Sequence, residues 1–173
     1  FICNRNRLGP LQSLVQSLKN RKYCNIVILD NKSTYKPLLD WYNTLTDVHV
    51  YYCAYNYGHE ALDHCRVREI AFQDRYESII RTQHYVYTDS DVVPVDDIPS
   101  DFINQMIHLC VKYKIPKLGL SLKVDDLPDH FTLKSEVVSW ESSLHQQNAI
   151  FDPICQLIKA PVDTTFAVNA PGH

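Results

Sequence analysis

Apolar positions along the chain follow two patterns that alternate with each other. Residues 25–29 form a continuous, mostly β-branched run, which is typical of a strand covered on both faces. Leu11, Leu14, Val15 and Leu18 instead fall at positions i, i+3, i+4 and i+7, the spacing of an amphipathic helix. Because short strands alternate with helices of about ten to fifteen residues, the pattern predicts βαβ units. The expected fold is α/β, with a mostly parallel central sheet flanked by helices.

The same pattern locates the individual elements. Strands are expected at residues 1–3, 25–29, 48–52, 85–88, 117–122 and 162–168. Helices are expected to begin at Pro10 and Pro37, to span about residues 60–80, and to follow a cap at residues 99–101. Residues 123–160 are less regular and could hold a loop or a partial lid. No repeat or linker divides the chain, so residues 1–173 are predicted to be one domain, and the absence of an initial Met leaves open a fragment of a longer protein.

Composition and charge exclude several classes of function. The chain has 173 residues, of which 45% are hydrophobic and 21% charged, and its net charge is −3. This balance argues against nucleic-acid binding, which requires clustered cations. No apolar run approaches the roughly 18 residues of a membrane span, and no signal peptide is recognisable. With only four glycines, neither a Walker A loop nor a GxGxxG turn can be written, so any nucleotide must be held by side chains and a metal ion.

The six cysteines show no CxxC pair and no regular spacing. Disulfide-stapled domains are usually shorter and denser in cysteine, and several of these residues sit inside apolar runs. We therefore expect reduced thiols and a cytoplasmic protein.

Polar residues follow four of the predicted strands, at residues 4–7, 30–31, 56–58 and 89–91. In an open α/β sheet, ligands bind outside the carboxyl ends of the strands. Asp89 and Asp91 stand one residue apart directly after a strand, and Pro94 prevents immediate entry into a helix. Two such carboxylates can share a hard divalent cation, Mn²⁺ or Mg²⁺. An Asp-rich turn that caps a helix is the alternative.

Taken in their order along the chain, these motifs resemble those of a known protein family. The first strand leads into Asn-Arg-Asn-Arg at residues 4–7, and the second ends in Asp-Asn-Lys-Ser-Thr at residues 30–34. Asn56 and Gly58 follow, and then Asp-Ser-Asp at residues 89–91. Over about residues 1–120 this order resembles the glycosyltransferases of family 2, which have the Rossmann-like GT-A fold. Lys32 stands where that family commonly has Gly.

The resemblance implies a function. It implies transfer of a sugar from a nucleotide-diphosphate donor, commonly a UDP-sugar, to the hydroxyl of a glycan, lipid or protein acceptor, with inversion and with Mn²⁺ or Mg²⁺ bound. The nucleoside would be held by Asn4 with its neighbours Cys3 and Arg5, and by Asp30 and Asn31.

It also implies roles for residues further along the chain. A basic residue of the third helix, Arg66 or Arg68, would contact the base or the diphosphate. In the Asp89-Ser90-Asp91 motif, Asp91 would bind the metal, and Asp89 would contact the ribose or a metal-bound water. A late histidine, His173, would be a further metal ligand.

The general base is expected downstream. Asp163 stands beside two threonine hydroxyls at the start of a late strand, and its position resembles that of the family's late acidic base. A structural aspartate bonded to those threonines is an equal alternative. Two other functions remain open: a sugar-phosphate nucleotidyltransferase, which would need a Gly-rich loop that residues 4–10 do not form, and a non-catalytic module that binds a nucleotide sugar or a partner protein.

Overall fold

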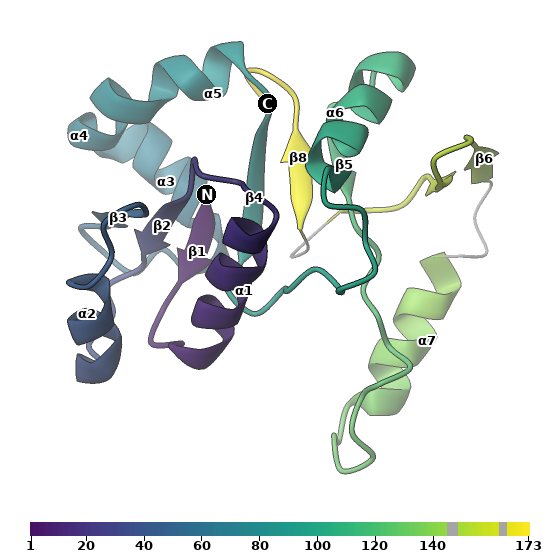
Figure 1. Cartoon of the computed structure of the whole chain (residues 1–173), viewed down its shortest axis with the longest axis horizontal. Coiled ribbons are helices and arrows are strands. Elements are labelled where there is room, and N and C mark those ends of the chain that lie inside the picture. The colour runs from purple at the N-terminus through teal and green to yellow at the C-terminus, as the bar shows by residue number, and fades with distance from the viewer. Residues whose placement is uncertain (145–148, 163–165) are drawn as a thin grey trace.

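A computed structural model of the chain describes residues 1–144, 149–162 and 166–173. It shows a mixed α/β fold around a six-stranded sheet, with helices on both faces of that sheet (Figure 1). The alternation of strand and helix patterns therefore predicted the fold class correctly.

The central sheet has the strand order β3-β2-β1-β4-β8-β5. Strands β1 to β4 pair in parallel, whereas β8 is antiparallel to both of its neighbours, β4 and β5. The sheet is therefore mostly parallel, as predicted, with one reversed strand. The strands are β1 (Ile2–Asn4), β2 (Val27–Asp30), β3 (His49–Tyr52), β4 (Tyr85–Asp89), β5 (Lys117–Gly119) and β8 (Ala167–Asn169).

The helices connect these strands. Helices α1 and α2 each begin with a proline in the first turn, where the missing N–H costs nothing and the fixed φ suits the helix. The helices are α1 (Gly9–Asn20), α2 (Lys36–Tyr42), α3 (Ala61–Arg68), α4 (Ile70–Phe72), α5 (Ser78–Thr82), α6 (Phe102–Tyr113) and α7 (Lys134–Leu144), with a 3-10 turn η1 (Gly58–Glu60) and a π-helical turn η2 (Gln73–Glu77).

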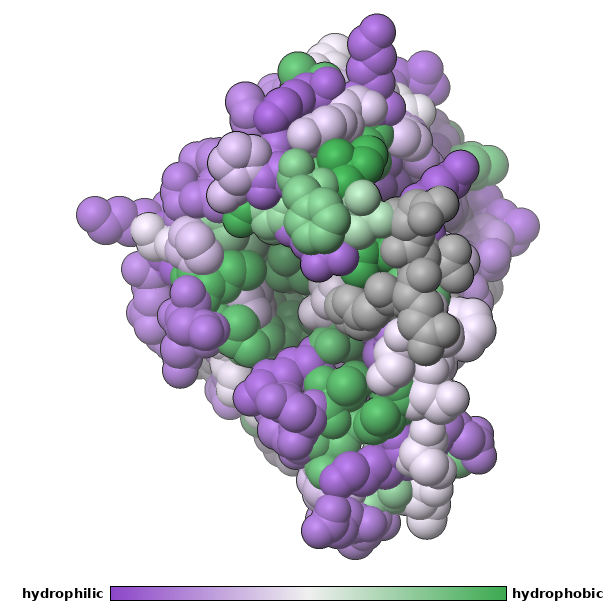
Figure 2. Space-filling model, turned by 90° about the vertical axis from the view of Figure 1, so that its right-hand side faces the viewer, coloured by the Kyte–Doolittle hydropathy of each residue, from purple (hydrophilic) through white to green (hydrophobic). Residues whose placement is uncertain are grey.

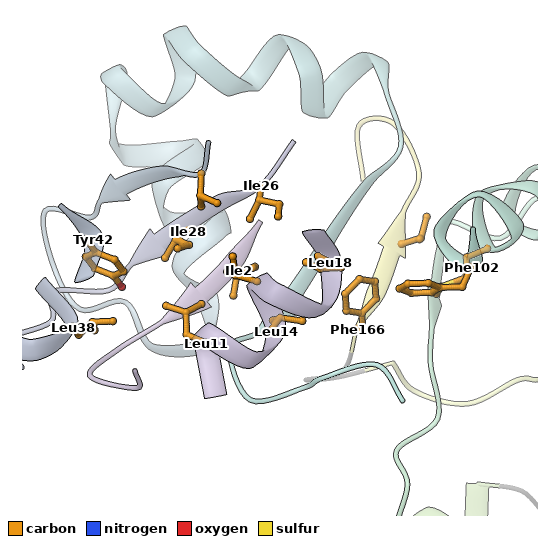
Figure 3. Close-up of a cluster of buried hydrophobic side chains, with 14 of the residues drawn as sticks. Ile2, Leu11, Leu14, Leu18, Ile26, Ile28, Leu38, Tyr42, Phe102 and Phe166 are labelled. Carbon is orange, nitrogen blue, oxygen red and sulfur yellow. The ribbon is translucent and has the colours of Figure 1, made fainter. Parts of the chain in front are cut away.

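One face of the sheet is covered by α1, α2 and α6 (Figure 3). The apolar stripe of α1 packs on the side chains of Ile2 and Ile28, which point to this face of the sheet. Phe102 of α6 contacts Phe166, just before β8, with 5.3 Å between ring centroids. This layer fixes the loop between β1 and α1 above the carboxyl end of β1.

The other face is covered by α3, α4 and α5, which pack on Leu29 and Cys53. We predicted one helix over about residues 60–80, and this prediction is wrong, because Glu69 breaks the helix with φ −114° and ψ 102°. The Glu69 carboxylate accepts hydrogen bonds from the Tyr51 hydroxyl (2.7 Å) and from the backbone N–H of Ala54 (3.0 Å). These bonds pull the backbone at Glu69 out of helical geometry and tie the layer to β3.

The chain between β5 and β8 stands away from the sheet (Figure 1). It contains α7 and a two-stranded antiparallel hairpin of β6 (Ala149–Phe151) and β7 (Gln156–Ile158), where the sequence suggested a loop or partial lid. Within its described part, the buried hydrophobic residues are Leu157 and, directly before β8, Phe166. Apolar side chains surround a hollow on the face seen in Figure 2.

All six cysteines are free in the structure. Among the helices of the described residues, none has both the length and the apolar character needed to cross a membrane.

Candidate functional site

The parallel strands β1, β2 and β4 end together at one edge of the sheet, which we call the carboxyl edge. In the strand register Asn4 lies opposite Asp30, and Cys3 lies opposite Asp89. Three of the four polar clusters predicted from the sequence therefore meet at adjacent strand ends. This is the place where open α/β sheets bind ligands.

Asn4 and Asp30 are joined through a buried tyrosine. The Asn4 side-chain N–H donates to the Tyr42 hydroxyl (2.9 Å), and that hydroxyl donates to Asp30 Oδ2 (3.0 Å). Burial raises the pKa of Tyr42 above its ordinary value, and the nearby charge of Asp30 adds to the rise. Tyr42 thus keeps its proton and holds both polar side chains in fixed positions at the edge.

The remaining polar atom of this cluster has no partner. Asn4 is only 1% exposed, and its Oδ1 is the one buried side-chain nitrogen or oxygen without a hydrogen bond among the described residues. The hydrogen bonds fix which end of the Asn4 amide faces Tyr42. The Tyr42 hydroxyl has one proton and donates it to Asp30, so the Asn4 side chain must donate its N–H to that hydroxyl. An unsatisfied buried acceptor costs about 1–3 kcal/mol. Such atoms are uncommon in folded proteins, and here it lies at the edge that parallel sheets use for ligands.

Asn31 connects two loops of the edge. Its side chain accepts a hydrogen bond from the Tyr57 backbone N–H (2.6 Å) and donates to the Gly58 carbonyl (2.8 Å). Gly58 has φ +64°, which only glycine adopts freely. Through these two bonds Asn31 positions the loop after β3.

The loop after β1 is tied to the loop after β2. Asn6 has φ 56°, and its Oδ1 accepts hydrogen bonds from the backbone N–H groups of Thr34 (2.7 Å) and Tyr35 (2.9 Å). Asparagine tolerates this left-handed conformation better than most residues. Asn6 therefore fixes the backbone between Arg5 and Arg7, whose side chains are both exposed.

The acidic motif lies beside a cavity. Ser90 is buried and its backbone N–H donates to the Cys3 carbonyl (3.1 Å), which holds the turn after β4 against β1. Asp91 forms an ion pair with Arg7. Both aspartates of the motif border a cavity of about 500 Å³, within the usual size range of small-ligand sites. The cavity is lined by Arg7, Asp89, Asp91, Val92, Val93, Val95, Leu122, Lys123 and Asp126.

The donor set suits a hard cation that shares its coordination with a ligand. No group of three or more His, Cys, Asp or Glu in the described part of the chain is arranged to hold a metal. Asp89 and Asp91 offer two carboxylates. Mg²⁺ and Mn²⁺ prefer oxygen, and Mg²⁺ sites commonly combine one or two carboxylates with water and phosphate oxygens.

Two predicted site residues lie elsewhere. Arg66 donates to Glu77 (3.2 Å) and to the backbone carbonyl of His173 (2.8 Å), which also accepts from the Tyr85 hydroxyl (2.7 Å). Tyr85 begins β4 and Asp89 ends it, about 13 Å away at the usual rise of a strand. The structure therefore does not bring Arg66 or His173 to the acidic motif.

The remaining predicted residues are placed as follows. The Cys3 thiol is buried and donates a hydrogen bond to the Gly58 carbonyl (3.6 Å), which joins β1 to the turn η1. Burial raises the pKa of this thiol to about 11. Arg68 ends α3 and is exposed. Asp163, the predicted general base, lies outside the described residues.

The sequence analysis did not identify two residues that belong to the candidate site. Tyr42 lies on the buried side of α2, and the available signal was that a buried tyrosine hydroxyl usually needs a hydrogen-bond partner. Lys123 lines the cavity from the segment after β5 and pairs with Asp126 (3.2 Å). Nothing in the local sequence places Lys123 next to the strand ends.

A larger cavity of about 920 Å³ lies at the opposite edge, where the parallel strands begin. Two of its polar side chains are already paired: Asp47 with Lys19 (2.6 Å), and His49 with the Tyr76 hydroxyl. Because parallel sheets bind ligands at the carboxyl edge, and because both aspartates of the acidic motif line the smaller cavity, we take the smaller cavity as the candidate site.

Comparisons of the chain with protein-family models and with curated proteins find no match.

Proposed function

We propose that this chain is a metal-dependent glycosyltransferase with a Rossmann-like GT-A fold. It would move a sugar from a nucleotide-diphosphate donor, a UDP-sugar in the simplest case, to an acceptor hydroxyl with inversion. The observation that carries the proposal is that Asp89 and Asp91 border a 500 Å³ cavity at the same edge where Asn4 and Asp30 end the neighbouring strands.

The two halves of the site have different chemistry, which suits the two halves of such a donor. The cluster of Asn4, Tyr42 and Asp30 is buried, so it fixes from within the strand ends against which a nucleobase would lie. The cavity beside β4 contains Asp89 and Asp91, which suit a divalent cation and a diphosphate. A bound cation supplies Lewis-acid stabilisation of the charge that develops on the departing diphosphate.

The proposed base is Asp163. Its carboxylate would accept the proton of the acceptor hydroxyl as the hydroxyl oxygen attacks the anomeric carbon and the bond to the diphosphate breaks. The direction of β8 supports this assignment. Because β8 is antiparallel to β4 and Ala167 pairs with Tyr87, the chain enters β8 from the carboxyl edge. Asp163 precedes Ala167 by four residues in the sequence.

The proposal is tested by thermal denaturation with a panel of nucleoside diphosphates, with and without Mn²⁺. A ligand at 100 times its dissociation constant stabilises by about 2.7 kcal/mol, which raises the melting temperature of a domain of this size by roughly 5–10 °C. We expect one nucleotide to give this shift only with Mn²⁺. We expect Asp91→Asn to lose the shift, because one of two metal carboxylates is gone.

The matched control is Asp40→Asn, since Asp40 is also an exposed carboxylate with a cationic partner, Lys36 (2.7 Å), but lies on α2. It should keep the full shift. A metal-independent shift in the wild type, or an unchanged shift in Asp91→Asn, contradicts the proposal. Strong Mn²⁺-dependent binding with no donor hydrolysis and no transfer would identify the non-catalytic module instead.

A further inference from the structure

Arg7 and Asp91, which both line the cavity, form an ion pair with each other. Arg7 belongs to the loop between β1 and α1, and Asp91 to the loop after β4, so the pair joins two loops that are far apart in the sequence. Both residues line the cavity together with Asp89. The carboxylate that the proposed function assigns to the cation is therefore already held by a guanidinium.

This ion pair can exchange its partners. The two side chains are 53% and 45% exposed, and exposed ion pairs contribute little to stability because water screens them. The backbone next to Arg7 is held by the bonds of Asn6 to Thr34 and Tyr35. A long, half-exposed side chain on a fixed backbone can turn from one partner to another without moving the loop.

The charges that line the cavity indicate which cationic side chain would lose its partner when a divalent cation binds. Three carboxylates (Asp89, Asp91 and Asp126) and two cations (Arg7 and Lys123) line it. Lys123 forms ion pairs with Asp126 (3.2 Å), which also lines the cavity, and with Asp125 (3.7 Å), so its charge is already balanced. A divalent cation at Asp91 would leave the Arg7 guanidinium without its carboxylate and the cavity with excess positive charge.

We propose that Arg7 is an exchange partner that couples cation binding to diphosphate binding. In the absence of a cation it neutralises Asp91. When a divalent cation binds Asp91, Arg7 is released and donates hydrogen bonds to the diphosphate, for which its planar fork of N–H groups is well suited. This inference rests on the proposed function and adds to it a positive coupling between the two ligands. Arg7 is a positioning residue in the first state and a ligand-binding residue in the second.

The test uses Arg7→Gln and two separate titrations. Mn²⁺ alone, followed by electron paramagnetic resonance of the free ion, should bind up to about fivefold more tightly to Arg7→Gln, because the competing guanidinium is gone. Inorganic pyrophosphate, titrated by calorimetry at saturating Mn²⁺, should bind about tenfold more weakly, because its charged donor is gone. Opposite changes for the two probes are the signature of exchange.

Two control variants separate exchange from general charge effects. Lys123→Gln removes the same charge from the same cavity, but its partners are Asp125 and Asp126, so Mn²⁺ affinity should change less than twofold. Arg81→Gln breaks an exposed ion pair with Glu77 (2.9 Å) on the helical layer and should change neither titration.

The outcomes distinguish this inference from the proposed function. Unchanged Mn²⁺ affinity in Arg7→Gln overturns the exchange while leaving the metal site intact. Equal tightening in Arg7→Gln and Lys123→Gln also overturns it, because general repulsion would then explain the effect. A wild-type protein that binds no Mn²⁺ overturns the proposed function, and the exchange with it. Since Arg7 is exposed, the substitution leaves the core unchanged.

Discussion

At the scale of single residues, the buried side chain of Asn4 lowers the stability of the fold, because one of its polar atoms makes no hydrogen bond within the protein. Its amide N–H is bonded to Tyr42, while its Oδ1 is buried without a partner. Asp30, equally buried, depends on the same tyrosine for a donor to Oδ2. A single hydroxyl therefore satisfies two buried polar groups, and the edge is sensitive to its loss.

We predict that Tyr42→Phe destabilises the protein by about 1–3 kcal/mol, because it leaves the Asn4 amide without any hydrogen bond and removes a donor from a buried carboxylate. The aromatic ring and its packing are kept, so the change reports the hydroxyl alone. Chemical denaturation at neutral pH measures it. Tyr35→Phe is the control, since Tyr35 is 46% exposed, and it should stay within about 0.5 kcal/mol of the wild type. Equal effects of the two variants would show that the bonds of Tyr42 add nothing.

Which single residues could be predicted depended on the range of their contacts. Asn4, Asp30 and Asp89 were found because a residue that directly follows a strand must lie at the end of that strand. The pairing of Arg7 with Asp91 could not be found, because it requires knowing that β1 and β4 are neighbours. The family resemblance implied a role at the edge for Arg66 or Arg68, yet the bond to Glu77 holds Arg66 towards the other end of the sheet.

At the scale of elements, the layer of α3, α4 and α5 is held by charge as well as by apolar packing. Glu77, in the π-helical turn, accepts hydrogen bonds from Arg66 of α3 (3.2 Å) and from Arg81 of α5 (2.9 Å). Its side chain is only 18% exposed, so these bonds are partly shielded from water. One carboxylate thus ties together two helices that the break at Glu69 separates.

We predict that Glu77→Gln destabilises the protein by about 1–2 kcal/mol at pH 7, because two charge-assisted hydrogen bonds are lost. Hydrogen bonds from Arg66 hold the pKa of Glu77 below its ordinary value of 4.5. A carboxylate with a lowered folded pKa stabilises fully above its unfolded pKa, and this contribution is lost as the pH falls through the folded pKa.

The stability difference between wild type and Glu77→Gln should therefore be constant above about pH 6 and shrink as the pH falls below about 4.5. Urea denaturation at a series of pH values measures this. Asp74→Asn, an exposed residue of the same turn, is the control and should show no such pH dependence. A difference that grows towards acid pH would mean that the pKa of Glu77 is raised, not lowered.

The elements that the sequence predicted well are those whose causes are local. α1 and α6 have strong helical periodicity, α1 has a proline in its first turn and α6 has one three residues before its start, so both were located to within a few residues. The break at Glu69 has a distant cause, because its carboxylate binds Tyr51 and Ala54 on β3. The direction of β8 is likewise decided by its pairing with β4 and β5, which no local pattern encodes.

At the scale of the whole molecule, β8 closes the fold over a long distance in the sequence. It lies between β4 and β5 and pairs with both, and Phe166 beside it is buried against Phe102 of α6. Of the described residues between β5 and β8, the buried hydrophobic ones are Leu157 and Phe166. Among the side chains of α7 that the structure describes, none is buried.

We predict that limited trypsin digestion cuts first after Lys123 or Lys134, because local opening is easiest where few side chains are buried. The cut chain should stay together in gel filtration, since β8 remains hydrogen-bonded to two strands and Phe166 remains packed on α6. Mass spectrometry of the earliest fragments identifies the cuts. Early cleavage after Lys32 would contradict the prediction. The backbone that follows Lys32 is fixed, because Asp30 and Asn6 accept hydrogen bonds from the N–H groups of Ser33 and Thr34. Separation of the fragments would show instead that the hydrogen bonds of β8 to β4 and β5 are too weak to hold this strand in the sheet once its covalent link to β5 is cut.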